Sequence, residues 1–131
     1  MRFLSLTMII FFIIPGACLA REYNERAYQA RWCENAGGVA EAVLPDRTRV
    51  DCLTDTHAVE VDFAPKWAEA IGQALYYSSM TGRSPGILLI MEREGDRRFL
   101  DRVLRVSGEL GIDVWTTTPL DLVNNNGLSP N

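Results

Sequence analysis

One stretch of the chain, residues 48–77, concentrates side chains that can carry out chemistry. Carboxylates come first, and a lysine, a glutamine and a tyrosine follow them: Asp51, Glu60, Asp62, Lys66, Gln73 and Tyr77. Carboxylate oxygens are the ligands that Mg²⁺ and Mn²⁺ prefer, and an amine beside them can offset negative charge on a phosphate. If these side chains converge, they supply the groups needed for a metal-dependent site that hydrolyses a phosphodiester bond.

Two short strands are expected to position the carboxylates. Polar and apolar residues alternate over residues 49–53 and again over 58–62, and a period of two is typical of a strand. The polar residues between the two runs suit a hairpin turn. Glu60 and Asp62 therefore point to one face, with Asp51 opposite them on the neighbouring strand. A plainer interpretation is that the three carboxylates form the solvent-facing side of a hairpin.

A helix that begins near Pro65 is expected to bring the other polar groups to these strands. Proline is favoured in a first helical turn, where its missing N–H leaves no bond unmade. Lys66, Gln73 and Tyr77 follow helical spacing and fall on one stripe roughly 60° wide. An adjoining apolar face can pack on the sheet: Trp67, Ile71 and Leu75. Tyr77 is expected to pack beside the site rather than to take part in the chemistry.

Further helices and strands are predicted on either side of this stretch. A helix is expected over residues 22–35, and a strand over 39–44 follows it. The apolar run 87–91 is typical of a parallel strand that is buried on both faces. Asp96 suits the N-cap of another helix, and a last strand is expected over residues 112–116.

The predicted helix that follows Asp96 has two distinct faces. Its inner stripe consists of Phe99, Val103, Val106 and Leu110. Basic residues lie largely outside that stripe: Arg97, Arg98, Arg102 and Arg105. A solvated face with ion pairs is the expected role of these arginines, and contact with phosphate groups is the alternative.

The order of the elements, α-β-β-β-α-β-α-β, predicts an α/β fold with a mixed β-sheet flanked by helices. Residues 21–117 are long enough for one compact domain. Residues 118–131 are expected to form a flexible C-terminal tail.

Residues 1–20 are expected to be a signal peptide. A basic residue is followed by an apolar run over residues 3–14, and small residues at 18–20 suit cleavage. The apolar run is short for a membrane span, which needs about 20 residues. The protein is therefore expected to be exported, and to be periplasmic or secreted. Retention of the segment as an uncleaved anchor is the alternative.

Charge and cysteine content bear on the same question. Residues 1–20 contain one of the 13 basic residues and none of the 17 acidic ones, so the remainder has a formal net charge of about −5. Nucleic-acid-binding proteins usually present a basic surface, so this balance argues against a nuclease.

Two cysteines remain after cleavage, Cys33 and Cys52, and an even pair in an exported protein predicts a disulfide. Its closure is worth about 3 kcal/mol in the chain-entropy model.

Several of these residues carry a family resemblance. The order of the polar residues on the predicted elements resembles that of the PD-(D/E)XK nuclease superfamily. The order is Asp51, then Glu60-Val61-Asp62, then the glutamine and tyrosine of Gln73-Ala74-Leu75-Tyr76-Tyr77. The glutamine and tyrosine are similar to the helix motif of its RecB-type branch. Glu25 is similar to the first-helix glutamate of archaeal Holliday junction resolvases. The resemblance covers roughly residues 22–115 and implies a restriction endonuclease-like core.

The resemblance also implies roles for individual residues. Asp51 and Glu60 would bind Mg²⁺ or Mn²⁺, with Glu25 contributing through water and Asp62 as an extra ligand or as a partner of Lys66. The family pattern places a lysine two residues after the glutamate, and that position is Asp62 here. Lys66 is the only lysine in the chain and would replace it from the start of the helix. Gln73 would orient Lys66 or the nucleic-acid backbone.

Two functions follow from these observations. The first is an exported Mg²⁺-dependent nuclease acting on nucleic acid, with DNA as the expected substrate. The second is a nuclease-fold module of the cell envelope that binds a partner without cleaving it, which the acidic charge and Asp62 favour. Many members of the superfamily pair two subunits, so a homodimer is an arrangement that the resemblance allows.

Overall fold

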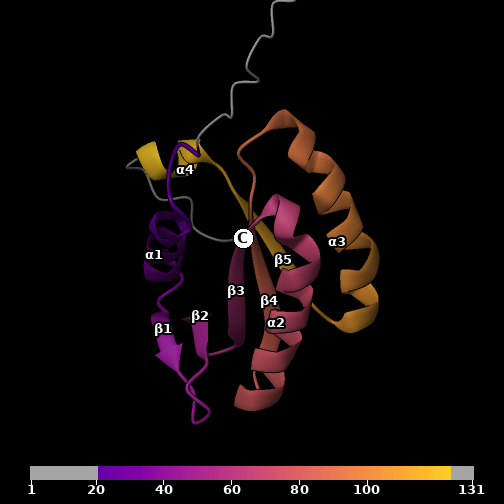
Figure 1. Cartoon of the computed structure of the whole chain (residues 1–131). Helices are drawn as coiled ribbons and strands as arrows, with labels where there is room; N and C mark the ends of the chain where they lie inside the picture. The colour runs from indigo at the N-terminus through magenta and orange to yellow at the C-terminus, as the bar shows by residue number, and fades with distance from the viewer. Residues whose placement is uncertain (1–20, 125–131) are drawn as a thin grey trace, which may run out of the picture.

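The computed structural model describes residues 21–124, and the predicted signal peptide lies outside them. Five strands form one sheet in the order β1-β2-β3-β4-β5, and helices flank it (Figure 1). The strands are β1 (Val39–Val43), β2 (Arg49–Leu53), β3 (His57–Phe63), β4 (Ser84–Ile90) and β5 (Asp113–Thr117). The helices are α1 (Glu25–Asn35), α2 (Trp67–Thr81), α3 (Arg97–Leu110) and α4 (Pro119–Val123), with short 3₁₀ turns at Ala64–Lys66 and Glu94–Asp96. The fold is therefore α/β, with a mixed sheet, as the order of elements predicted.

The pairing of the strands changes from antiparallel to parallel at β3. Strands β1 to β3 form an antiparallel meander, whereas β3, β4 and β5 run parallel and are joined by α2 and α3. The β3–β4 ladder extends over the whole of both strands, from the His57–Ser84 pair to the Phe63–Ile90 pair. By contrast, β2 pairs with β3 only at Cys52–Val59 and Leu53–Ala58. The strand that carries Glu60 and Asp62 is thus fully paired on one side and only briefly paired on the other.

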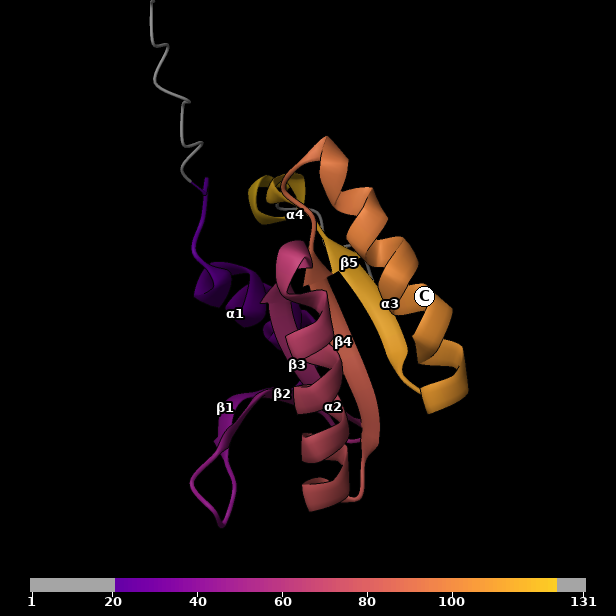
Figure 2. The same cartoon turned by 45° about the vertical axis from the view of Figure 1, so that its right-hand side comes forward.

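Helices cover both faces of the sheet. Helix α1 packs on one face, where Tyr28 and Cys33 contact apolar residues of β3 and β4. Helices α2 and α3 cover the other face and lie side by side in both views (Figures 1 and 2). Side chains of β4 alternate between the two cores, because Leu88 and Ile90 face α1 while Ile87 and Leu89 face α2 and α3. The prediction that residues 87–91 form a strand buried on both faces is therefore confirmed for residues 87–90.

The predicted disulfide is present between Cys33 and Cys52, and it ties α1 to β2. Both cysteines are buried. Gly38 lies in the turn after α1, next to the disulfide. A Cβ at this position would lie 2.5 Å from Cys52 Sγ and 3.0 Å from Cys33 Sγ, so only glycine leaves room for the disulfide.

Three local predictions were wrong in whole or in part. Asp96 occupies the predicted N-cap position of α3, but its side chain makes no capping bond to this helix, because Oδ2 accepts the N–H groups of Glu92 and Arg93 in the 3₁₀ turn before it. Leu110 lies at the end of α3 and is 43% exposed, so it does not continue the inner stripe. Residues 119–123 form α4 rather than a loose tail, because Thr118 and Asp121 make a capping box and proline begins the helix.

Element ends differ from the predictions by at most three residues, and β2 has the predicted bounds. Helix α1 begins at Glu25, where the Asn24 side chain accepts the Ala27 N–H. Residues 125–131 of the predicted tail lie outside the described part. Among residues 21–124, none of the helices is long and apolar enough to cross a membrane.

Candidate active site

The opening between β2 and β3 is occupied by the side chain of Asp51. The ladder between these strands stops at the Cys52–Val59 pair. One residue further along β2, Asp51 Oδ2 accepts the Val61 N–H at 2.8 Å and so replaces a ladder bond with a side-chain bond. Its backbone oxygen accepts Gln29 Nε2 of α1 at 2.7 Å. Both contacts fix the Asp51 carboxylate against β3, next to Glu60.

Glu60 is buried in this opening. The residue is 5% exposed, and Oε2 has no hydrogen-bond partner among the described residues. Burial raises the pKa of Glu60 well above its usual range, and the negative charge of Asp51 raises it further. The two side chains share a hydrogen bond that favours protonated Glu60 and ionised Asp51. Without a cation, Glu60 is therefore a neutral acid at neutral pH.

Asp62 lies on the same face of β3 and is also buried, at 3% exposure. Its Oδ1 accepts the Phe63 N–H at 2.9 Å and lies 3.8 Å from Lys66 Nζ. Desolvation raises the pKa of Asp62 to about 7, although the lysine opposes this shift. The interpretation of these carboxylates as the solvent-facing side of a hairpin is wrong, because both faces of β3 are covered.

Lys66 belongs to the 3₁₀ turn that joins β3 to α2, and its side chain is 51% exposed. Its ion pair is with Asp62. In the part of the chain that the structure describes, no ion pair within 4.0 Å joins Lys66 to Asp51 or Glu60. The structure thus brings the lysine to the edge of the carboxylate cluster.

Glu25 is the first residue of α1. Its charge contributes to the raised pKa values of Asp51, Glu60 and Asp62. Four carboxylates from three elements are therefore close enough to influence one another electrostatically.

Gln73 and Tyr77 lie on α2 beside the cluster. Tyr77 donates its hydroxyl to Gln73 Oε1 at 3.3 Å, and Gln73 Nε2 contacts Glu69 at 3.4 Å. Burial, followed by the charges of Glu60 and Asp51, raises the pKa of Tyr77 to about 12. Gln73 makes no hydrogen bond to Lys66 within residues 21–124, so its position does not match an orienting role for the lysine. Tyr77 packs beside the carboxylates, as expected.

The residues fit a hard divalent cation in their chemistry. Every candidate ligand is a carboxylate, and Glu60 Oε2 is buried without a hydrogen-bond partner among residues 21–124. Within residues 21–124, however, no three histidine, cysteine, aspartate or glutamate side chains form a preassembled metal site. Binding would therefore require the carboxylates to draw together, and it would displace the proton of Glu60.

Glu41 is a neighbour of the cluster that the sequence analysis missed. It lies on β1 at a φ of 55°, a left-handed conformation that is rare for glutamate. Its charge raises the pKa of Asp51, and it also pairs with Arg26 at 3.8 Å. One signal was available, because Glu41 is the only charged residue in the run 39–44.

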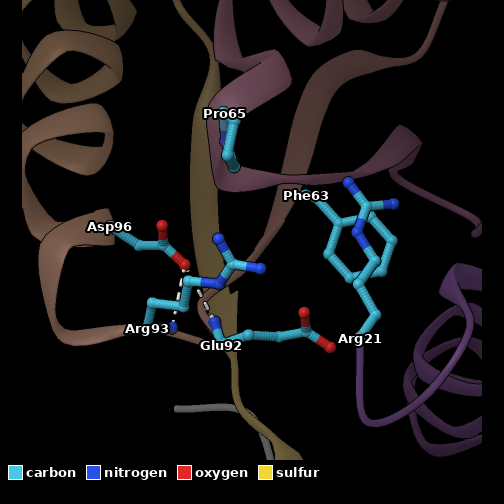
Figure 3. Close-up of a pocket in the computed structure, with 6 residues that line it drawn as sticks. All are labelled: Arg21, Phe63, Pro65, Glu92, Arg93 and Asp96. Atoms are coloured by element: carbon cyan, nitrogen blue, oxygen red, sulfur yellow. Dashed lines mark hydrogen bonds between the residues drawn. The ribbon is translucent and has the colours of Figure 1, made fainter. Parts of the chain in front are cut away.

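A small pocket lies at the carboxyl ends of β3 and β4. Its lining residues are Arg21, Phe63, Pro65, Glu92, Arg93 and Asp96 (Figure 3). The Arg21 guanidinium lies 3.6 Å from the centre of the Phe63 ring. Phe63 packs on the α1 side of the sheet, and none of Asp51, Glu60 and Asp62 is among the lining residues.

Comparison of the chain with family models, curated proteins and solved structures finds no match.

Proposed function

We propose that this chain is an exported, metal-dependent nuclease with a restriction endonuclease-like core, acting on DNA. The observation that carries the proposal is the buried, unpartnered oxygen of Glu60 beside Asp51, in a gap where a strand ladder ends. A buried acid with a raised pKa destabilises the fold at neutral pH, and such groups concentrate at functional sites. The order of elements and the mixed sheet agree with the proposed core.

Asp51 and Glu60 would bind Mg²⁺ or Mn²⁺. Asp62 and Glu25 would add negative charge around the cation. The cation would polarise the scissile phosphate and lower the pKa of an attacking water. Lys66 has the freedom to leave Asp62, since half of its side chain is exposed. Its amine would then donate to a phosphate oxygen and offset the charge that develops there. Tyr77 would shield Glu60 and Asp51 from bulk water.

The ion pair between Lys66 and Asp62 supports a second function, a module that binds without cleaving. Asp62 occupies the place of the family lysine, and Lys66 pairs with Asp62 rather than with Glu60. A domain that kept the carboxylates but lost the phosphate-directed amine would be a binding module of the cell envelope that does not cleave.

A cleavage assay separates the two functions. The disulfide-bonded protein would be tested on plasmid, linear duplex, single-stranded DNA and RNA with Mg²⁺, Mn²⁺ or EDTA. Glu60→Ala and Lys66→Ala would be compared with Glu109→Ala, an exposed acidic position on α3. We expect metal-dependent cleavage that is lost in the first two variants and kept in the third.

Calorimetry with Mn²⁺ completes the test. Binding that Glu60→Ala abolishes, in a protein that cuts none of these substrates, would support the binding module. Absence of Mn²⁺ binding to the wild-type protein would refute the assignment of the metal site and the nuclease function built on it.

A further inference from the structure

A cationic surface lies on α2 and α3 directly beside the candidate site. It consists of Lys66, Trp67, Arg98, Phe99 and Arg102, and we call it the arginine–tryptophan surface. Its three basic side chains are exposed, while the two aromatic rings are half-buried between the helices. The formal net charge of residues 21–131 is about −5, so this concentration of positive charge runs against the balance of the chain.

The aromatic rings hold the two arginines in place. The Arg102 guanidinium lies 5.7 Å from the centre of the Trp67 ring and 5.6 Å from that of Phe99. The Arg98 guanidinium lies 4.6 Å from the centre of the Phe99 ring. A guanidinium that rests on an aromatic face loses mobility but keeps N–H donors at its edge, and these match phosphate oxygens.

The same arginines are not neutralised by neighbouring acids. Within residues 21–124, neither Arg98 nor Arg102 forms an ion pair, and the nearby acid Asp101 is bound by Arg97 at 3.1 Å. The expected solvated face is confirmed, because all four arginines of α3 are exposed, but within residues 21–124 an ion pair forms at Arg97 and not at Arg98, Arg102 or Arg105. Two guanidinium groups one helical turn apart are left to face solvent.

The surface is continuous with the carboxylate cluster. Trp67 follows Lys66 in the chain, and Lys66 Nζ lies 3.8 Å from Asp62. Helices α2 and α3 run side by side away from that point (Figures 1 and 2). A chain of phosphates that enters the site at Lys66 would continue over Trp67 and Arg102 toward Arg98.

We propose that the arginine–tryptophan surface binds the phosphate backbone of the nucleic acid that the site acts on. The inference rests on the proposed function for the identity of the polyanion. The surface has the two features that backbone binding needs, which are unpaired arginines and an adjoining site for a metal-bound phosphate. Contacts of this kind fix position and do not read sequence.

The test is oligonucleotide binding to the full-length, disulfide-bonded protein in EDTA, which stops cleavage. Fluorescence anisotropy would follow a single-stranded and a duplex probe over a range of salt concentrations. The test variant is Arg98→Gln with Arg102→Gln, and the matched control is Arg31→Gln with Arg47→Gln. Both variants remove two positive charges, but the control residues lie on α1 and in the β1–β2 turn, away from this surface.

We expect the test variant to bind about 10- to 50-fold more weakly at low salt. The slope of log K against log salt should fall by about 1.4 with the single strand or about 1.8 with the duplex, for two lost phosphate contacts. The control variant should stay within about twofold of the wild type. Arg98→Lys with Arg102→Lys should restore most of the slope, because the charge is kept. Unchanged urea midpoints would show that all the variants are folded.

Equal weakening in the test and control variants would overturn the proposal, because the effect would then be one of net charge alone. Unchanged binding in the test variant would overturn it as well. Binding to anionic phospholipid vesicles but not to oligonucleotides, lost in the test variant, would assign the surface to a membrane instead. Mn²⁺ binding measured by calorimetry is independent of all these results, so failure of this surface and failure of the metal site are distinguishable.

Discussion

Replacing Glu60 with glutamine should stabilise the metal-free protein and abolish metal binding. Glutamine has the shape of the protonated acid, and its amide can donate to Asp51 as the acid does. The pKa of native Glu60 lies well above the value of 4.5 that an unperturbed glutamate has, chiefly because the side chain is buried. The native state therefore keeps a proton at Glu60 that the unfolded chain releases.

The size of the effect follows from proton linkage. When the native pKa of an acid is raised, stability is greatest below the unfolded pKa and is lost as the pH rises toward the native pKa. Each pH unit above 4.5 removes 1.36 kcal/mol from the free energy of unfolding. Near pH 7 the loss from Glu60 amounts to about 3 kcal/mol. This value does not depend on the native pKa, provided that it lies above 7.

Urea unfolding followed by tryptophan fluorescence would measure this difference in EDTA. Glu60→Gln should match the wild type near pH 4.5 and exceed it by about 3 kcal/mol near pH 7. Glu109→Gln, at an exposed position, is the control and should follow the wild type throughout. With Mn²⁺ present, the wild type should gain stability and Glu60→Gln should not.

Two results would refute this reasoning. A constant difference between Glu60→Gln and the wild type from pH 4.5 to pH 8 would mean that Glu60 does not titrate on unfolding. A variant less stable than the wild type near pH 7 would mean that the carboxylate is stabilised by a contact that glutamine cannot make.

Three further predictions concern the residues around the site. Lys66→Ala should abolish cleavage but leave Mn²⁺ binding within about threefold, since the lysine lies at the edge of the cluster; loss of both would make Lys66 part of the metal site. Replacing Cys33 and Cys52 together with alanine should lower the free energy of unfolding by about 3 kcal/mol in urea titrations, and an unchanged midpoint would contradict this. Gly86→Ala would place a Cβ 2.8 Å from the Trp115 ring. It should cost about 1–3 kcal/mol and alter the near-UV circular dichroism, whereas an unaltered spectrum would show that the ring moves freely.

Much of the fold could be predicted because hydrophobic periodicity is a local property. Alternation located β2 and β3, and the continuous apolar run located β4. The same method failed where a contact between loops decided the outcome. Asp96 looks like a helix cap in the sequence, but two loop N–H groups bind its carboxylate instead. Helix α4 was missed because five residues are too few to show a helical period.

The candidate site was predictable in its members but not in its contacts. Periodicity placed Glu60 and Asp62 on one face of a strand, and this face is the one that α2 covers. Periodicity could not show that the β2–β3 ladder ends at Cys52, and this early end is what opens the space for the Asp51 carboxylate. The left-handed backbone conformation of Glu41 could not be predicted from the sequence either, because it depends on the path of β1 and not on residue type.

The disulfide and the carboxylate cluster are best understood together. Cys52 directly follows Asp51 in β2, and its bond to Cys33 fixes this strand to α1, the helix that also carries Glu25. The disulfide adds about 3 kcal/mol to the free energy of unfolding. This is close to the stability that is lost near neutral pH because native Glu60 keeps its proton. A small domain that must hold repelling carboxylates together therefore gains a compensating constraint at the place where they meet. Because disulfides persist mainly in oxidising compartments, the bridge is compatible with the proposed export.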